Sequence, residues 1–303
     1  MRTTLAALAT AALIASSLHA GNVDATVAKE LTRLDAALGR IDAGALPADL
    51  SSMFKLSHDG LDRARSAKSP LVRLYRLRQP YISIEMLLFF DAHKSAAADM
   101  PHVVALWNER RPAYEKRHPV ARGTVLMRAL EQASLNRAQK LFRASLPYAK
   151  VTAPFSGAYY VAEAEGNLRF YEFVSALATG KNEPRPDAGA IGNALEALEK
   201  DTIALFESDP ASRTAIPASA ALKEARELYD QGLFEGASLL ILESRLELSK
   251  RKQAPTHVTA AASHSDTMTT LWSEIEGEAQ LDVGKMIHDD VLPLYASFFR
   301  SGS

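Results

Sequence analysis

The chain has 303 residues, of which 47% are apolar and 23% are charged, and its formal net charge is −1. This balance is typical of a globular protein and argues against a disordered chain. Because the chain contains no cysteine, it excludes disulfide bonds, thiolate catalysis and haem attachment through Cys-x-x-Cys-His. A chain of this length can bury one large core or two smaller ones.

The amino-terminal end has the pattern of a secretory signal peptide. Arg2 supplies one positive charge, an apolar stretch runs from Leu5 to Leu18, and a small residue, Ala20, precedes a polar start. The stretch is shorter than the ~20 apolar residues that span a bilayer. We therefore expect residues 1–20 to be cleaved after Ala20, giving a periplasmic or secreted protein without a transmembrane segment.

Helical periodicity dominates the rest of the chain. Val27, Leu31, Leu34, Leu38 and Ile41 follow one another at steps of four, three, four and three, which places them on one face of a helix. The same steps recur over 191–205, and further helices are expected over about 122–146 and on both sides of residue 232. Residues 150–155 are the only weak strand candidate. We predict an all-α fold of antiparallel helical hairpins, packed as an αα superhelix or an irregular helical bundle.

Proline positions and charge suggest how the chain is divided. Prolines are expected to separate short helices in the front half, at Pro70, Pro80, Pro101, Pro112, Pro119 and Pro147. Residues 21–180 contain 22 Lys and Arg against 16 Asp and Glu, whereas residues 181–303 contain 12 against 20. The paired prolines near residue 185 favour a linker. We predict a basic helical-hairpin region over 21–180, a linker over 181–190 and an acidic helical region over 191–303 packed on the first. Its last segment, 266–299, should be one or two helices interrupted near Gly284 and Pro293.

A short motif is repeated along the chain. Residues 73–81 and 140–148 are identical at four of nine positions, and each copy ends in Pro-Tyr. We expect a helix to end at each of these prolines and the next helix to begin at Tyr81 or Tyr148. A looser copy over 227–237 has Gly232 at the turn. Repeated helical hairpins are typical of helical arrays, because one hairpin cannot bury its own apolar face.

The third copy resembles a known repeat. The residues that carry the resemblance, within Leu222–Leu246, are Tyr229, Gly232, Phe234, Ala237, Ile241 and Ser244. They are similar to the helix–turn–helix core of a tetratricopeptide repeat, although the copies are 67 and 87 residues apart instead of ~34. The resemblance implies antiparallel packing and a groove for a peptide or protein, and it brings no catalytic residues. The alternative is that any tight helical hairpin selects Gly or Pro, aromatic residues and Ala.

Two acids in apolar surroundings are the candidate catalytic residues. Glu85 sits inside the largely apolar stretch 81–90, and Glu243 follows the apolar run 239–242. Burial would raise the pKa of such a carboxyl toward the range useful for a general acid. A structural ion pair or an exposed position is the alternative, and Arg245 is near Glu243 in sequence.

Two pairs could contribute to a metal site. His58 and Asp62 are four residues apart, and His288 precedes the acidic residues Asp289 and Asp290. Imidazole and carboxylate groups bind cations, but a solvated helix end explains each pair as well. We expect no cofactor.

Candidate binding residues come from the basic stretch and from aromatic side chains: Arg73, Arg76, Arg78, Tyr81, Tyr148, Tyr159 and Tyr160. Their chemistry favours a peptide, a protein or an anionic envelope component held in a groove, and the near-neutral pI argues against nucleic acid. The sequence therefore favours an exported binding or scaffold protein of the cell envelope. The alternatives are a glycan-directed helical hydrolase that uses a buried Glu and a metal-binding periplasmic protein.

Overall fold

The computed structural model describes residues 23–46, 48–93, 99–177, 182–208, 215–250 and 266–299. The predicted signal peptide, residues 1–20, lies outside the described residues. The packing of the chain forms two compact units, one ending at Ala92 and the other beginning at His93. Each unit buries apolar residues of its own.

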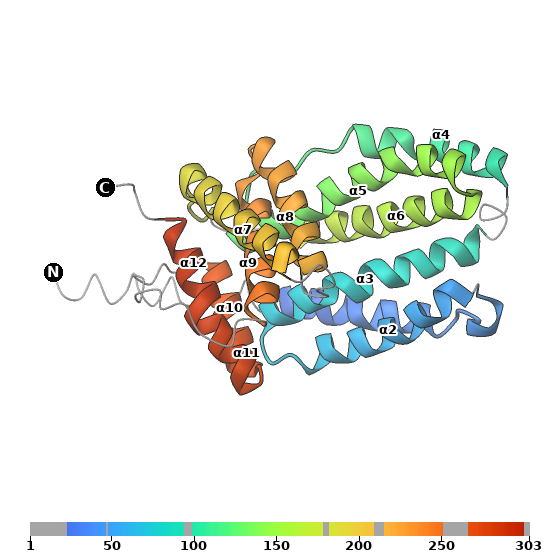
Figure 1. Cartoon of the computed structure of the whole chain (residues 1–303). Coiled ribbons are helices and arrows are strands. Elements are labelled where there is room, and N and C mark those ends of the chain that lie inside the picture. Colours follow the sequence, from blue (N-terminus) through green and yellow to red (C-terminus); the bar gives the residue numbers. More distant parts are fainter. Residues whose placement is uncertain are drawn as a thin grey trace. The chain divides into compact units, whose positions relative to one another are not determined.

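The predicted all-α fold class is confirmed, because all regular structure in the described ranges is helical (Figure 1). None of the described helices is long and apolar enough to cross a membrane. The weak strand candidate at 150–155 is wrong, since one helix continues to Val151 and the next begins at Pro154. At the end of the first of these helices, the Thr152 N–H donates a helical hydrogen bond to the Tyr148 carbonyl.

In the described part of the first unit, residues 23–46 and 48–92, there are three helices and a short 3-10 turn, η1 (Ala43–Ala45). A helix over 23–38 is followed by α2 (Ala48–Ser66) and α3 (Pro70–Ala92). The apolar stripe predicted for the first helix is buried, as Val27 and Leu34 illustrate. Ion pairs connect the same helix to its neighbours, from Asp35 to Arg65 of α2 and from Arg33 to Glu85 of α3.

Three prolines that were expected to end helices lie inside them. Pro80 is within α3, Pro112 within α4 (Met100–Glu115) and Pro147 within α5 (Val125–Val151), so the predicted Pro-Tyr turns are wrong. A proline inside a helix removes one backbone hydrogen bond, but tertiary packing can outweigh that loss. At Pro80 the packing is evident, because a Cβ placed on Gly60 of α2 would lie 2.9 Å from the Pro80 Cβ. By contrast, Pro70 begins α3, and Pro101 lies in the first turn of α4.

The second unit is arranged around α5, whose residues are buried along most of its length. Its partner in a long antiparallel hairpin is α6 (Pro154–Leu177), and the two lie side by side in Figure 1. Helix α4 packs on both, and α8 and α9 pack on α5 from another side. The remaining helices of the unit are α7 (Ala188–Ser208), α8 (Ala215–Asp230), α9 (Phe234–Ser249), α10 (Thr267–Glu278), α11 (Leu281–Met286) and α12 (Leu292–Ser297).

The turn between α8 and α9 is the one expected at Gly232. Gly232 has a φ of +74°, the left-handed region that favours glycine. The Leu233 N–H donates to the Leu228 carbonyl and the Gly232 N–H to the Tyr229 carbonyl, both at 2.9 Å. This pair of bonds is a Schellman motif, which satisfies the last carbonyls of α8. The resemblance to a tetratricopeptide repeat stays a prediction.

The carboxyl-terminal segment is interrupted elsewhere than expected. The break falls at residues 279–280, between α10 and α11, whereas Gly284 and Pro293 lie in helical structure. Between α11 and α12 the helix widens into a π-turn, η3 (Ile287–Val291), in which the Leu292 N–H donates to the Ile287 carbonyl. Since Pro293 has no N–H to donate, this wider turn allows the helix to continue past it.

The predicted linker is held firmly in the second unit. The Glu183 carboxylate accepts hydrogen bonds from the Val125 N–H at 2.7 Å and from the Thr267 N–H at 3.0 Å. The Asp187 N–H donates to the Phe298 carbonyl at 2.6 Å. The assignment of 181–190 as a linker between two regions stays a prediction. These contacts show that residues 183–187 pack within the second unit, Glu183 against the start of α5 and Asp187 against Phe298.

The α5–α6 hairpin provides a test of this packing. A Cβ added to Gly157 of α6 would lie 2.4 Å from the Ala149 Cβ, so Gly157→Ala should destabilise the protein by about 1–3 kcal/mol through overpacking. Gly277→Ala is the control, because nothing lies within 4 Å of its added Cβ, and the better helix propensity of Ala should slightly raise the melting temperature. Thermal unfolding followed by circular dichroism measures both. Equal melting temperatures for the two variants would contradict close packing at Gly157.

Candidate functional site

The predicted basic binding residues are engaged inside the first unit. Arg73, Arg76 and Arg78 lie on α3 and are all half-buried. The Arg73 guanidinium forms an ion pair with Asp24 and donates to the Ala67 carbonyl at 3.0 Å. Arg76 and Arg78 also interact with other groups of the protein. These arginines thus have structural partners.

Glu85, one of the two candidate catalytic acids, lies in an ion pair. Its carboxylate accepts a hydrogen bond from Arg33 Nη2 at 2.7 Å, and the same guanidinium bonds Glu30. The Arg33 guanidinium carbon lies 5.7 Å from the centre of the Tyr81 ring. Burial, with the charges of Glu30 and Glu85, raises the pKa of Tyr81. The structural ion pair is therefore the better interpretation of Glu85.

Glu243, the other candidate acid, is half-buried on α9 and interacts with other groups of the second unit. The nearby Arg245 forms its closest ion pair with Asp290 of the π-turn, at 2.5 Å. Glu85 and Glu243 belong to different units.

The four candidate metal ligands have other neighbours. The His58 ring packs edge-on against Phe54, and Asp62 bonds Arg65 at 3.1 Å. His288 Nδ1 lies 3.2 Å from Glu276 Oε1, and Asp290 pairs with Arg245. Among the residues that the structure describes, no group of three or more His, Asp or Glu is placed to hold a metal ion.

The predicted aromatic binding residues of the second unit gather at the α5–α6 turn. The rings of Tyr148 and Tyr160 are 4.6 Å apart, and Tyr159 lies 6.3 Å from Phe155. Tyr148 is 47% exposed, whereas Tyr160 packs against the core of the hairpin.

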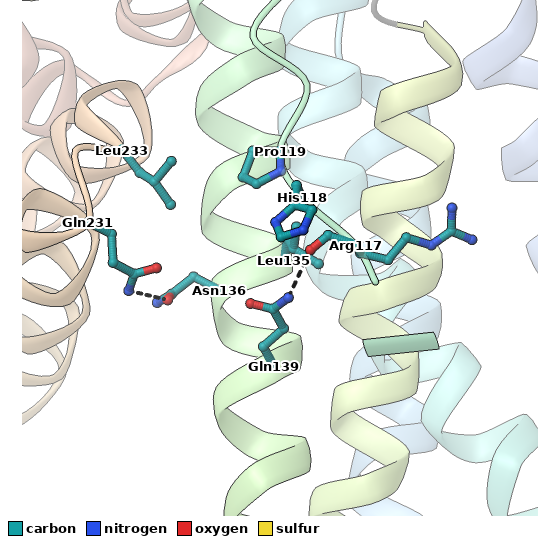
Figure 2. A pocket seen from close by; sticks show the side chains of 8 residues that line it. All are labelled: Arg117, His118, Pro119, Leu135, Asn136, Gln139, Gln231 and Leu233. Carbon is teal, nitrogen blue, oxygen red and sulfur yellow. Dashed lines mark hydrogen bonds between the residues drawn. The ribbon is translucent and has the colours of Figure 1, made fainter. Parts of the chain in front are cut away.

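A pocket of about 220 Å³ opens elsewhere in the second unit (Figure 2). It is bounded by α5, by the α4–α5 connection and by the α8–α9 turn. Leu135 and Asn136 of α5 are buried at its base, with 1% and 5% of their surface exposed. The other residues around it are Arg117, His118, Pro119, Gln139, Gln231 and Leu233. Its lining therefore combines apolar contacts with three carboxamide side chains.

Gln139 fixes the α4–α5 connection beside the pocket. Its Nε2 donates to the Tyr114 carbonyl at 2.9 Å and to the Arg117 carbonyl at 3.1 Å, which satisfies carbonyl groups at the end of α4. From α6, the Tyr171 hydroxyl donates to the His118 carbonyl at 3.0 Å. Leu135 belongs to the same apolar cluster as Tyr171. The wall formed by 117–119 is thus attached to a packed core.

Gln231 fixes the opposite wall. Its Nε2 donates to Asn136 Oδ1 at 3.0 Å and to the Glu227 carbonyl at 2.9 Å. Asn136 Nδ2 is buried and has no hydrogen-bond partner among the described residues. A buried donor without an acceptor is unfavourable by about 1–3 kcal/mol.

A buried ion pair lies close to the pocket, on the face of α5 that also carries Asn136. Arg128 and Glu235 are each 1% exposed, and Arg128 Nε donates to Glu235 Oε1 at 2.7 Å. Arg128 also donates to the carbonyls of Gly123 and Glu183. Gln132, one turn before Asn136, donates to Glu235 Oε2 at 2.9 Å and accepts from the Gly236 N–H at 2.7 Å.

Glu131 is a second buried acid on α5, and it is fully shielded from solvent. Burial raises the pKa of its carboxyl, while the hydrogen bond from the Ser175 hydroxyl and the Val120 backbone amide partly offset that rise. No Asp or Glu lines the pocket itself. The pocket lining offers hydrogen bonding, from the carboxamides and the His118 ring, and apolar contact.

No family model, curated protein or solved structure matches the chain. The structure itself therefore provides the description: in its described residues this is an all-α protein with a small pocket lined in part by carboxamide side chains. Asn136, Gln139 and His118 were not predicted as site residues. The signal in the sequence is a group of four polar residues in a part of α5 that also contains many apolar ones: Glu131, Gln132, Ser134 and Asn136.

The buried pair gives a prediction about stability. Glu235→Gln should lower the free energy of unfolding by about 3–5 kcal/mol, because the Arg128 charge loses its buried counter-ion. Glu115→Gln is the control, since it removes one partner of the exposed Arg111–Glu115 pair and should change stability by less than ~1 kcal/mol. Urea unfolding at pH 7 measures both. A loss below 1 kcal/mol for Glu235→Gln would mean that the pair is dispensable.

Glu131 gives a prediction about pH. Because the folded state raises this pKa above its ordinary value of 4.5, folding favours the protonated carboxyl, and its contribution to stability is lost as pH rises through the folded pKa. Glu131→Gln should therefore melt at a higher temperature than the unaltered chain at pH 7, by about 2–4 °C for each kcal/mol gained. Below pH 4.5 the difference should vanish. The exposed Glu207→Gln is the control, and melting curves from pH 4 to pH 8 provide the measurement.

Proposed function

We propose that the protein is an exported binding protein of the cell envelope that holds a segment of a peptide or protein in the pocket beside α5. Export rests on the amino-terminal sequence, residues 1–20. Binding rests on one observation, which is the pocket beside α5, whose lining combines apolar residues with three carboxamide side chains and the His118 ring.

The mixture of groups around the pocket suits a peptide. Leu135, Leu233 and Pro119 offer apolar contact for an aliphatic side chain, and the carboxamides offer hydrogen bonds. The pocket volume of about 220 Å³ is below the roughly 300–1,000 Å³ of pockets that enclose a drug-sized ligand. It therefore admits a short part of a chain, and the rest of the partner would lie outside it.

A variant that fills the pocket tests this proposal. Leu233→Trp places a larger ring at the pocket wall, whereas Ile203→Trp adds the same ring at a position of α7 that is 59% exposed and does not line the pocket. Fluorescence anisotropy with labelled, end-capped tripeptides that differ in the central residue measures Kd. Leu233→Trp should weaken binding at least ~10-fold, and Ile203→Trp should leave it unchanged.

Circular dichroism of both variants shows whether they fold. The proposal is wrong if the unaltered chain binds none of the tripeptides at millimolar concentration. It is equally wrong if a folded Leu233→Trp variant binds them as tightly as the unaltered chain.

A further inference from the structure

The turn between α5 and α6 exposes apolar side chains that do not line the pocket. Val151, the last residue of α5, is 84% exposed, and Tyr148, one turn earlier, is 47% exposed. Phe155 and Tyr159 of α6 are half-buried beside the turn, with their rings 6.3 Å apart. These four residues are called the hairpin tip below. An exposed apolar group of this kind often marks a surface that another molecule or a membrane covers.

The hairpin tip lies at one end of the second unit. The other end of the α5–α6 hairpin is marked by the Leu126 N–H, which donates to Thr267 Oγ1 of α10 at 3.1 Å. Because an α-helix rises about 1.5 Å per residue, Val151 lies about 38 Å from Leu126 along α5. Helices α10–α12 gather at the end opposite to the tip (Figure 1). These helices are therefore remote from anything that contacts the tip.

The basic residues of the α5–α6 hairpin give the tip a positive charge. Residues 132–162 contain four Lys and Arg residues and no Asp or Glu. Two of the four, Arg137 and Lys140, form ion pairs with acids of α6 and α8. The other two, Arg143 and Lys150, are exposed and form no ion pair with any residue that the structure describes. The tip and its surroundings are therefore complementary to a surface that is both negative and partly apolar.

The acids on the neighbouring helices have partners of their own. On α6, the Glu163 carboxylate accepts a hydrogen bond from Arg137 Nη2 at 2.7 Å. At the start of α4, which packs on the same hairpin, the Asp99 carboxylate lies 2.8 Å from His102 Nδ1. Neither acid pairs with the two exposed basic residues near the turn.

We propose that the hairpin tip attaches the protein to an anionic phospholipid surface. The Val151 side chain enters the boundary between headgroups and acyl chains. The tyrosine rings lie at headgroup level, where both their apolar bodies and their hydroxyl groups are accommodated. Arg143 and Lys150 extend from the hairpin to lipid phosphates. This contact does not involve the pocket, which lies about 20 Å nearer the start of α5.

Two other partners agree less well with these observations. A second copy of the chain, bound through the same surface about a two-fold axis, would place Arg143 and Lys150 against the same cations of its partner. An acidic protein would need a surface shaped to enclose the turn, and specific interfaces bury about 800 Å² on each partner. A layer of lipid headgroups adapts to the turn without such a shape. The lipid surface is therefore favoured, and the other two partners are outcomes of the test.

The lack of cysteine in the chain allows a local test. Val151→Cys introduces a single thiol, which is labelled with an environment-sensitive fluorophore. Leu281→Cys is the matched control, because Leu281 is also an aliphatic residue, is 87% exposed and begins α11 at the other end of the unit. The labelled full-length chain is titrated with vesicles of equal parts phosphatidylcholine and phosphatidylglycerol, and with vesicles of phosphatidylcholine alone.

We expect the mixed vesicles to shift the emission of the label at residue 151 to shorter wavelength, and brominated lipids to quench it. The label at residue 281 should not respond, and vesicles of phosphatidylcholine alone should bind more weakly because they lack net negative charge. The lipid concentration that gives half of the response at residue 151 measures the affinity of the tip itself.

Charge variants of the chain labelled at residue 151 test the electrostatic part. Arg143→Gln combined with Lys150→Gln should raise the lipid concentration for half response at least ~10-fold, because two attractive charges are lost. Lys200→Gln combined with Lys223→Gln removes the same charge from exposed positions of α7 and α8 and should leave that concentration unchanged. Circular dichroism shows whether each variant folds.

An unchanged emission at residue 151 with mixed vesicles would overturn the proposal in favour of a protein partner. An equal response at residue 281, or equal affinity for the two kinds of vesicle, would also overturn it. A shift at residue 151 that depends on protein concentration and not on lipid would assign the surface to a second copy of the chain. None of these results alters the prediction for the pocket, which Leu233→Trp tests separately.

Discussion

The buried ion pair between Arg128 and Glu235 is the interaction on which the second unit depends. Two charges removed from water are stable only when they are paired and their remaining hydrogen-bonding groups are satisfied. Arg128 meets this requirement through two backbone carbonyls, and Glu235 meets it through Gln132. Helix α5, the start of α9 and residues 183–184 are therefore held together at one point.

The same arrangement positions the candidate pocket. Gln132 and Asn136 lie one turn apart on α5, so each faces the helical pair α8–α9. Gln132 accepts from the Gly236 N–H, and Asn136 accepts from Gln231, on either side of the α8–α9 turn. Gly236 permits this close approach, since an added Cβ would lie 2.8 Å from the Gln132 Cβ. The ion pair and the pocket are thus neighbouring parts of a single helix contact.

The parts of the fold that could be predicted from the sequence are those set by local periodicity. The buried stripe of the 23–38 helix, the position of α7 and the glycine at the α8–α9 turn all follow from residues close together in the chain. Pro80 was misjudged because its place in α3 depends on Gly60, a contact with a different helix. Glu85 lies among apolar residues in the sequence, but its ion-pair partner Arg33 is 52 residues away, so the pair could not be predicted from local sequence.

The pocket residues could not be predicted for the same reason. Asn136 looks like an ordinary polar residue of a helix until Gln231, 95 residues later, is brought beside it. The orientation of the Gln231 carboxamide depends in turn on its bond to the Glu227 carbonyl. Patterns within one helix contain no information about such a chain of contacts.

Gly232 has a consequence for how the specificity of this pocket could change. Nothing lies within 4 Å of a Cβ built on this residue, so its role is the left-handed backbone and not close packing. The residues on either side, Gln231 and Leu233, both line the pocket. Because the Schellman bonds of the turn use backbone atoms, the side chains at 231 and 233 can be exchanged while the hairpin keeps its course. The backbone of the turn can therefore stay constant while evolution, or a protein engineer, varies these two pocket-lining residues.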